Sequence, residues 1–583
     1  MLSSAFIIQP VKATEGTIYI RADGSVDPPT APIQRDGDVY TFIGNIYESI
    51  VIEKDNIVID GADHALQGTG SGKGIDLSGR TNVTIKNTSI KGFYFGIYLD
   101  RDSSGSTISG NNIKNNRQGI QVYGSGNTIS ENSIAANDYG IKIYDCSGNQ
   151  IFGNNITANN RDGISLEGYG LAPERTRDNV ISGNTITKNQ RGVSLGQYSR
   201  YNSVIGNNIT ENSSWSIEFY GSNNTVSGNH FERNMGGIYI FGSGHTIFGN
   251  IITNNTNYGI LIQDSSNNVL RNNLMILNKY NLGVKGSQLS NFIHDIDESN
   301  TINDKPVYYW INKYNATVPV NAGYVGIINS INITINQLEL KSNYQGVLLA
   351  YTKGSTIANN IVSNDLYGVY LYGSSYNNIS QNDITNNNVY GIHIDSSYSN
   401  TFSENNITNN AGSGIRFDWS HHNIISDNNI VANENEGIWL SQSSDNIIFG
   451  NRIESNQEGI RLYVSSDNTF YHNYFINNTA QVYDDAWDGW ANPSINVWDD
   501  GYPSGGNYWS DYEEKYPNAT EIDGSGIWDT PYVIDENNRD NYPIIPEFST
   551  ALILLLLFAS TTLVATILSK KRTKKQMVNR FYK

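Results

Sequence analysis

The chain repeats one short unit across most of its length. A glycine followed by alternating aliphatic residues recurs at steps of 22 or 23 residues in the second half and at similar steps in the first. These glycines are Gly74, Gly96, Gly119, Gly140, Gly163, Gly192, Gly237 and Gly259, then Gly346, Gly368, Gly391, Gly414, Gly437 and Gly459. Each unit holds three short runs in which apolar and polar residues alternate, a pattern typical of β-strands. Such a unit predicts one coil of a parallel β-helix, because a β-propeller blade needs about 40–45 residues.

Two columns of asparagine follow the same spacing. The first column is Asn111, Asn132, Asn154, Asn184, Asn207, Asn229, Asn250 and Asn272, then Asn359, Asn382, Asn405, Asn428, Asn451 and Asn473. The second is Asn116, Asn137, Asn159, Asn189, Asn212, Asn234 and Asn255, then Asn364, Asn387, Asn410, Asn433, Asn456 and Asn478. Asparagine tolerates left-handed backbone angles and forms hydrogen bonds within its own turn. We therefore expect these residues at the corners of the coils, stacked in hydrogen-bonded ladders.

The repeat and its flanks predict the organisation of the chain. We expect an all-β protein with a long parallel β-helix, a small acidic C-terminal module and one C-terminal transmembrane helix. At a strand spacing of ~4.8 Å, about 19 coils would form a rod of ~90 Å. An irregular stretch in the middle is either a protruding hairpin or a bent coil. The expected boundaries are 1–14 (remnant signal peptide), 15–40 (N-terminal cap), 41–283 and 331–480 (β-helix halves), 284–330 (irregular insertion), 481–545 (acidic, Trp-rich module), 546–569 (anchor) and 570–583 (basic tail).

Both ends of the chain indicate export. The segment 549–569 carries no charge and has the ~20 residues that one helix needs to cross a bilayer. Basic residues follow it at once, so the tail 570–583 should stay in the cytoplasm and the rest outside. The alternative for 549–569 is a buried core helix. Residues 1–14 have the short apolar run and small residues of the end of a signal peptide. We therefore expect a cell-surface protein anchored to the membrane by its C-terminus.

Charge and cysteine content exclude several classes of function. The formal net charge is −18, with an isoelectric point near 4.9, which argues against nucleic acid as a partner. Residues 480–547 contain 15 acidic residues against Lys515 and Arg539. Cys146 is the single cysteine of the chain, so a disulfide framework or a cysteine-rich metal cluster is excluded.

One outward strip in the second half has the side chains of a sugar-binding surface. The positions two residues after the glycine are Tyr370, His393, Arg416, Trp439 and Arg461, and those four residues after it are Tyr372, Asp395, Asp418, Ser441 and Tyr463. Aromatic faces can stack on sugars, while Asp, Arg and His can bond to hydroxyl groups. The strip therefore predicts contact with an extended glycan. The alternative is a solvated face whose aromatic residues merely favour strands.

A narrower hypothesis is catalysis on the same strip. Asp395 and Asp418 fall on adjacent coils, and glycosidases use two carboxylates separated by about 5–9.5 Å. His393 and Arg416 lie beside them and would tune their pKa values. These four residues are the candidate catalytic set.

Two further features concern ligands and modification. Asp523, Ser525 and Asp529 place oxygen donors at alternating positions, as in a calcium loop, although local turns explain the same residues. No other cofactor is indicated. Asn-x-Ser/Thr sequons predict a glycoprotein, and examples are Asn82, Asn208, Asn315, Asn406 and Asn518. Asn315 and Asn518 lie off the repeat and are the better candidates.

The coils with Asn-Asn-Ile-Thr and Gly-Ile-Tyr-Leu resemble those of the NosD-type right-handed parallel β-helix proteins. These belong to the wider class of carbohydrate-binding and sugar-hydrolysing (CASH) β-helix domains, and the resemblance covers most of residues 40–480. Pro546-Glu547-Phe548, followed by the apolar segment and the basic tail, is similar to the PEF-type sorting signal of archaeal surface proteins. That resemblance implies a processing enzyme of the archaeosortase type as a partner.

The preferred interpretation is a membrane-anchored extracellular β-helix that binds carbohydrate or forms part of the cell envelope. One alternative is a surface polysaccharide hydrolase or lyase that acts on an elongated glycan. Another is a purely structural spacer or adhesin.

Overall fold

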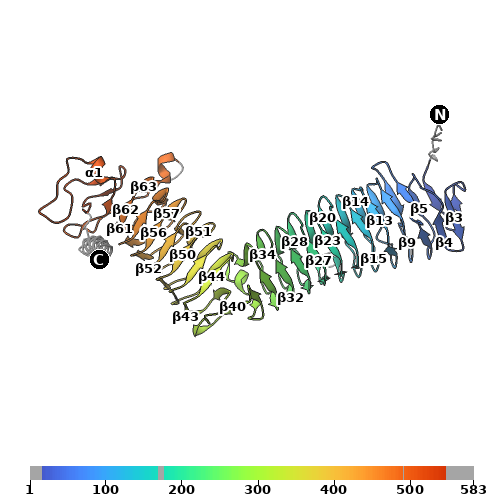
Figure 1. The fold of residues 1–583 in the computed structure, drawn as a ribbon, viewed down its shortest axis with the longest axis horizontal. Coiled ribbons are helices and arrows are strands. Elements are labelled where there is room, and N and C mark those ends of the chain that lie inside the picture. The colour runs from blue at the N-terminus through green and yellow to red at the C-terminus, as the bar shows by residue number, and fades with distance from the viewer. Residues whose placement is uncertain (1–15, 169–175, 490–491, 546–583) are drawn as a thin grey trace, which may run out of the picture.

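The computed structural model describes residues 16–168, 176–489 and 492–545. They form an all-β parallel solenoid of about 20 turns, which confirms the fold predicted from the repeat. Figure 1 shows two straight stacks of turns that meet at a bend. The N-terminal arm runs to β39 (Thr301–Ile302), and the C-terminal arm begins at β40 (Lys305–Ile311).

One turn illustrates why the repeat forms this structure. β15 (Thr128–Ser130), β16 (Ser133–Ala135) and β17 (Tyr139–Tyr144) lie on three sides, and their alternating isoleucines are fully buried in the core. β17 pairs in parallel with β20 (Asp162–Glu167) of the next turn, with Ile141 opposite Ile164. Like residues therefore stack on like residues from turn to turn.

One sheet of each arm lies on the inner side of the bend (Figure 1). In the N-terminal arm this inner sheet includes β11 (Phe95–Leu99), β14 (Gln118–Val122), β17, β20, β24 (Arg191–Leu195), β28 (Trp215–Phe219), β31 (Gly236–Ile240), β34 (Tyr258–Gln263) and β37 (Tyr280–Lys285). In the C-terminal arm it includes β40, β42 (Tyr324–Ile328), β45 (Gln345–Ala350), β48 (Tyr367–Tyr372), β51 (Tyr390–Asp395), β54 (Ile415–Asp418), β57 (Glu436–Ser441), β60 (Glu458–Tyr463) and β63 (Ala480–Asp484). We call the solvent-facing side of these two sheets the inner face.

The asparagine columns form buried ladders, as the sequence predicts. Asn132 donates from Nδ2 to Asn154 Oδ1 of the next turn (2.9 Å) and to the carbonyl of Ile108 (2.8 Å). Because each amide connects three successive turns, the ladder satisfies corner groups that water cannot reach.

Three members of the predicted columns are wrong by one residue. The ladders contain Asn273 and Asn360 where the sequence analysis placed Asn272 and Asn359. In the second column Asp365, not Asn364, accepts from Asn343 N (2.6 Å). In each case two adjacent polar residues compete for one position, and the sequence alone does not show which one faces inward.

A third ladder was not recognised from the sequence. It runs through Asn127, Asn149, Asn179, Asn202, Asn224 and Asn268 in the N-terminal arm and through Asn377, Asn400, Asn423, Asn446, Asn468 and Asn496 in the C-terminal arm. His245 occupies one of its positions, and the Asn224 backbone N–H donates to the His245 ring.

At the bend, one sheet of the N-terminal arm continues as the inner sheet of the C-terminal arm. β36 (Leu274–Ile276) pairs with β39, which turns back as an antiparallel hairpin into β40. β40 then pairs in parallel with β42, so it starts the inner sheet of the C-terminal arm. Residues 284–330 thus contribute strands to the stack at the bend.

The described part of the acidic segment closes the end of the core. Trp498 stacks on Phe470 at 4.2 Å between ring centroids, and Trp509 stacks on Phe475 at 4.4 Å. β64 (Tyr508–Trp509) pairs with β62 (Tyr474–Ile476) of the last turns. At the other end, β1 (Ile18–Ile20) and β3 (Ile33–Asp36) form antiparallel pairs with β2 (Val26–Asp27) and β4 (Val39–Phe42).

The predicted anchor is not part of this description. Within residues 16–168, 176–489 and 492–545, no helix has the length and hydropathy needed to cross a bilayer. The expected signal peptide 1–14, Pro546-Glu547-Phe548, the apolar segment 549–569 and the basic tail 570–583 all lie outside the described residues.

Candidate glycan-binding face

The predicted strip lies on the inner face of the C-terminal arm. Tyr370, His393, Arg416, Trp439 and Arg461 occupy paired positions on the successive strands β48, β51, β54, β57 and β60. Tyr372, Asp395, Asp418, Ser441 and Tyr463 form the parallel column two residues further along the same strands. The structure therefore brings all ten residues onto one face of the sheet, where Tyr370 and Ser441 are buried. No ligand contact tests their proposed roles.

The rings and guanidinium groups of the strip pack against one another. The ring of Tyr370 stacks on that of His393, with centroids 4.9 Å apart. Arg416 and Arg461 approach the indole of Trp439 from the turns on either side, at 3.6 and 5.0 Å from the ring centroid. Trp439 is thus held between two cations and does not offer an open stacking surface.

Asp418 is the centre of a tight polar cluster. Its carboxylate accepts from Arg416 Nε (2.7 Å) and Nη2 (2.8 Å) and lies 2.9 Å from His393 Nε2. Burial opposes ionisation, but these bonds from His393 and Arg416 outweigh it and lower the pKa of Asp418 to about 2. Asp418 therefore stays ionised and holds the side chains of His393 and Arg416 in place.

Asp395 lies opposite Asp418 on the neighbouring strand but in a different environment. Burial raises the pKa of Asp395 above its ordinary value, although the Ser396 hydroxyl donates to its Oδ1 at 2.7 Å. The two carboxyl groups thus have pKa values shifted in opposite directions.

A second aromatic column crosses the bend, and the sequence analysis missed it. The rings of Tyr344, Tyr367 and Tyr390 follow one another at centroid distances of 5.5 and 5.6 Å. Across the bend, Tyr344 lies 6.0 Å from Tyr258, which stacks on Trp215 at 5.4 Å. In most of these turns the ring comes directly before the repeat glycine, a signal that the sequence already contained. We call these five residues the aromatic column.

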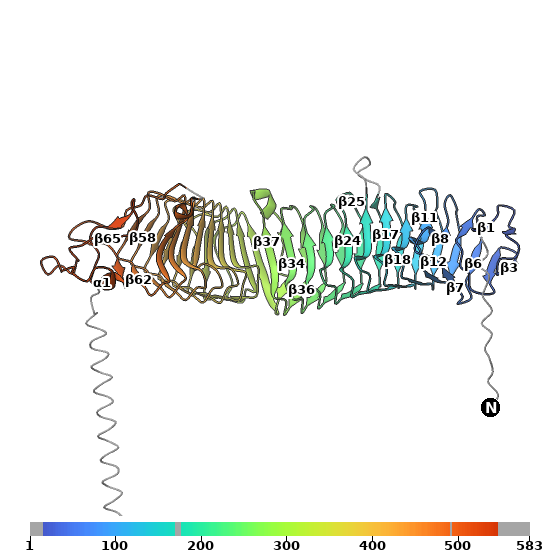
Figure 2. The same cartoon turned by 90° about the horizontal axis from the view of Figure 1, so that it is seen from above.

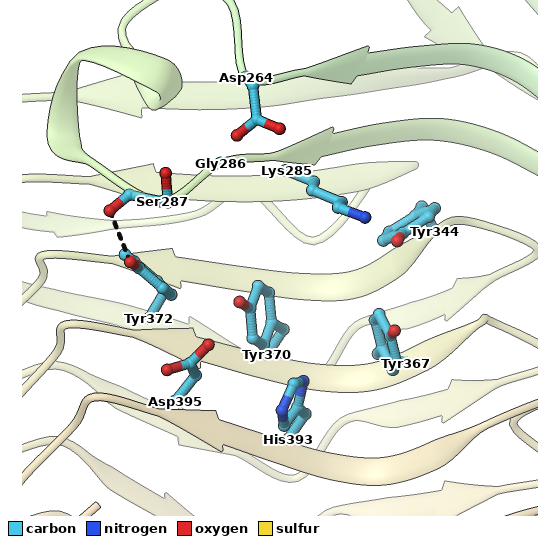
Figure 3. Close-up of a pocket in the computed structure, with 10 residues that line it drawn as sticks. All are labelled: Asp264, Lys285, Gly286, Ser287, Tyr344, Tyr367, Tyr370, Tyr372, His393 and Asp395. Carbon is cyan, nitrogen blue, oxygen red and sulfur yellow. Dashed lines mark hydrogen bonds between the residues drawn. The ribbon is translucent and has the colours of Figure 1, made fainter. Parts of the chain in front are cut away.

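A pocket of about 440 Å³ opens beside this column at the bend. Figure 3 shows its lining residues, and they come from both arms: Asp264, Lys285, Gly286, Ser287, Tyr344, Tyr367, Tyr370, Tyr372, His393 and Asp395. The Tyr372 hydroxyl donates to the Ser287 carbonyl at 2.6 Å, which closes one side of the pocket. Predicted strip residues and unpredicted residues thus share one cavity.

The far end of the strip holds a group of carboxylates that sequence reasoning also missed. Arg461 forms ion pairs with Asp485 (2.6 Å), Glu436 (3.5 Å) and Glu458 (3.8 Å). Burial, which outweighs the attraction of Arg461, raises the pKa of Glu458 to about 7. Glu436 and Glu458 also come directly before the repeat glycine, so the same position carries either rings or carboxylates along the arm.

Two of the three calcium candidates, Asp529 and Ser525, form local hydrogen bonds. Asp529 accepts from the Thr520 backbone N–H (3.0 Å) and from the Thr520 hydroxyl (2.6 Å). The Ser525 hydroxyl donates to the Ile522 carbonyl, and Asp523 has a left-handed backbone. No group of three or more His, Cys, Asp or Glu side chains suited to a metal ion occurs among the residues that the structure describes. Calcium binding stays an untested prediction.

Comparison with known proteins defines the fold family. A family model described as "Right handed beta helix region" matches residues 38–174, 118–275, 170–321 and 345–502, which together exceed half of the chain. No curated protein sequence is significantly similar to this chain.

Several solved structures are similar to this chain at low sequence identity. An alginate lyase from Paenibacillus sp. str. FPU-7 is 16% identical, with coverage of 40% of this chain and 90% of the lyase and a TM-score of 0.26. A mutant of the periplasmic alginate epimerase AlgG is 12% identical over 78% of this chain and 83% of the other, with a TM-score of 0.20. A mutant tailspike protein of E. coli bacteriophage HK620, in complex with a hexasaccharide, is 12% identical over 65% and 69%, with a TM-score of 0.28. At these TM-scores the likeness carries no inference about activity.

Proposed function

Because the chain belongs to the right-handed β-helix family, whose rigid stack presents outward side chains at regular intervals, we propose that it binds an extended carbohydrate along its inner face. The observation that carries this proposal is the aromatic column, which continues across the bend beside a pocket lined by four tyrosines. Tyr258, Tyr367 and Tyr390 are partly exposed and offer flat apolar surfaces, while the buried rings of Trp215 and Tyr344 support them from below.

The polar groups beside the rings support the same proposal. Carbohydrate sites combine apolar surfaces with a few well-placed polar groups. Here Asp395 and His393 border the pocket, and Asp418 fixes the position of His393. The aromatic side chains are held by their neighbours, so little conformational entropy is lost when a ligand binds.

A glycan array followed by calorimetry on the full-length protein tests the proposal. We expect Tyr367→Ala to weaken binding about fivefold to tenfold, because it removes one ring from the centre of the column. The matched control is Tyr398→Ala, since Tyr398 is exposed and contacts Tyr376 away from the pocket. The proposal would be contradicted if both variants lost the same amount of glycan affinity, or if the wild type bound no glycan.

A second candidate function is glycoside hydrolysis at Asp395 and Asp418. The observation that favours it is the opposite shift of the two pKa values, which is how paired carboxylates acquire acid and base roles. Against it, both oxygens of Asp418 are already bonded to Arg416 and His393. Release of products from a bound oligosaccharide, abolished by Asp395→Asn, would favour hydrolysis over binding alone.

The location of the protein forms a further part of the proposal. We propose that the protein is exported and tethered at the cell surface, with Pro546-Glu547-Phe548 as a sorting signal of archaeal type and a NosD-like role in the envelope. The uncharged segment 549–569 and the basic residues after it support this proposal. Mass spectrometry of the natural C-terminus separates a retained helix from a chain that a sortase has cut near Phe548.

If no glycan binds, the remaining alternative is a structural spacer or adhesin. In that case the outward side chains of the inner face would have no binding role, and the protein would act as a rigid rod.

A further inference from the structure

The bend pocket is built by both arms, and its shape depends on how they meet. Gly286 and Ser287 follow the last inner strand of the N-terminal arm, whereas Tyr370 and Tyr372 lie on β48 of the C-terminal arm. Besides its bond to Ser287, the ring of Tyr372 lies 5.5 Å from that of Phe292. The pocket is therefore a fixed feature of the bend and not a gap between side chains of one sheet.

The cations of the inner face differ in whether they have a carboxylate partner. Arg416 and Arg461 are ion-paired in the C-terminal arm, and Lys142 and Arg191 are ion-paired in the N-terminal arm. Lys285 is exposed, and in the described ranges its ammonium group forms no ion pair. The sequence analysis treated Arg416 as part of the glycan-binding strip, but Asp418 already occupies that guanidinium. Lys285 is the cation with free bonding capacity at the pocket.

The pocket is also asymmetric. In Figure 3 the Lys285 side chain extends over the pocket toward Tyr344, whereas Asp395 lies on the other side, next to Tyr372. Tyr370 lies between them, with its ring orientation fixed by the stack on His393. A ligand in this pocket would meet a flat ring in the middle, the ammonium group of Lys285 and the carboxyl group of Asp264 at one edge, and the carboxyl group of Asp395 at the other.

We propose that the bend pocket binds a sugar ring that carries an anionic group, with that group at Lys285 and ring hydroxyls at Asp395. This inference rests on the proposed function and names the class of glycan that the inner face selects. A carboxylate, sulfate or phosphate group on the sugar would gain a charge-assisted hydrogen bond from the ammonium group. Asp395 can accept hydrogen bonds from sugar hydroxyls. In a hexuronate, several hydroxyls lie on the side of the ring opposite the sugar's own carboxylate.

The net negative charge of the protein does not oppose this arrangement at physiological salt. Charges farther than about 8 Å are largely screened there, so the groups within the pocket decide the local attraction.

Calorimetry with matched oligosaccharides tests the inference on the full-length protein. The probes are hexamers that contain glucuronate, galacturonate or mannuronate, each paired with its carboxyl-reduced form, and one sulfated neutral hexamer. We expect at least one acidic hexamer to bind about tenfold more tightly than its reduced form. Lys285→Gln should remove this preference, so that the acidic hexamer and its reduced form bind with similar affinity.

Lys353→Gln is the matched control, because it makes the same charge change at a lysine that lies over Tyr376 outside the pocket. If Lys285→Gln and Lys353→Gln lowered the affinity for the acidic hexamer equally, the preference would reflect general electrostatic attraction, and the inference would be overturned. Equal affinity of the wild type for acidic and reduced forms would also overturn it, although glycan binding itself would then stand. Failure of every hexamer and every array glycan to bind would instead overturn the proposed function. Binding of the sulfated hexamer, if it depends on Lys285, would show that the pocket recognises the charge and not the carboxyl group.

Discussion

The two arms share one backbone plan and one kind of core, yet their inner faces differ. In the N-terminal arm the polar side chains pair with one another: Arg191 binds Asp162 (2.6 Å) and Glu218 (2.9 Å), and Lys142 binds Glu167 (3.1 Å). In the C-terminal arm the inner face combines rings, a fixed histidine and the edge of a pocket. The repeat therefore determines the strands and the core, while the outward columns are free to vary and differ between the arms.

The position of the aromatic residues sharpens this contrast. Tyr98, Tyr123 and Tyr144 follow one another in the N-terminal arm at 5.8 and 5.5 Å, and Lys73 lies 3.6 Å over the ring of Tyr98. Far from the bend, these rings line no pocket that joins the two arms. Aromatic residues are thus common to both arms, and the bend places some of them beside a pocket.

The largest expected effect concerns the core that both arms share. Ile260→Asp in the N-terminal arm and Ile415→Asp in the C-terminal arm each place a carboxyl group at a fully buried position, which costs several kcal/mol, roughly. Because a solenoid is stabilised mainly between neighbouring turns, each change should open a local block. Limited proteolysis with mass spectrometry should find new cleavage sites in the altered arm alone, whereas Ile251→Asp at an exposed position should have little effect. Cleavage throughout both arms would show that they unfold as one unit.

A smaller effect is expected from the polar cluster of the C-terminal arm. The pKa of Asp418 is about 2 in the folded protein and about 3.9 when unfolded, so its ionised form stabilises the fold above about pH 3.9 and this contribution is lost as the pH falls through about 2. Asp418→Asn should therefore lower the free energy of unfolding at pH 7 by at most about 2–3 kcal/mol. Denaturant unfolding at pH 7 and at pH 2.5 measures the difference, which should shrink at the lower pH. Asp427→Asn, at an exposed carboxylate on another sheet, provides the control.

A stabilising change is expected at Asp365, where the C-terminal arm departs from the asparagine ladder. Burial raises the pKa of Asp365 well above its ordinary value, and its Oδ2 is buried with no hydrogen-bond partner among the described residues. The folded state thus holds a proton that the unfolded chain releases above about pH 3.9, and stability falls as the pH rises from there. Asp365→Asn should raise the free energy of unfolding at pH 8 by about 1–3 kcal/mol and flatten its pH dependence. Asn387→Asp, the reverse change one turn away, should destabilise at pH 8; no change in either variant would refute this account.

The smallest expected effect is on binding by the N-terminal arm. Tyr98→Ala should leave the affinity for glycan unchanged, because Tyr98 lies many turns from the bend pocket and its ring already contacts Lys73. Calorimetry beside Tyr367→Ala measures this difference between the arms. A loss of affinity in Tyr98→Ala would extend the binding surface along the whole rod.

The features that repeat are those that the sequence predicts well. The strands, the buried isoleucines and the ladders recur at fixed intervals, and each copy confirms the others. The third ladder was missed although its C-terminal part, from Asn377 to Asn496, is unbroken, whereas in the N-terminal arm His245 takes one of its positions. The aromatic column escaped notice because the positions just before the glycine also hold Asp162, Arg191 and Glu436, so no single residue type marks them.

The bend pocket could not be predicted, because it depends on contacts that do not repeat. Ser287 and Tyr372 are 85 positions apart and meet across a change of sheet that occurs once in the chain. Likewise, the pairing of Arg416 with Asp418 depends on side-chain rotamers. The sequence showed that the two residues are neighbours, but not that they bond to each other instead of to a ligand.

A stack of identical parallel strands has no natural end, since each exposed edge is a template for another strand. The antiparallel pairs at β1–β4 and the stacked indoles of Trp498 and Trp509 cover the two terminal turns of this solenoid. Because these edges are covered, we expect copies of the protein not to join end to end through their sheets.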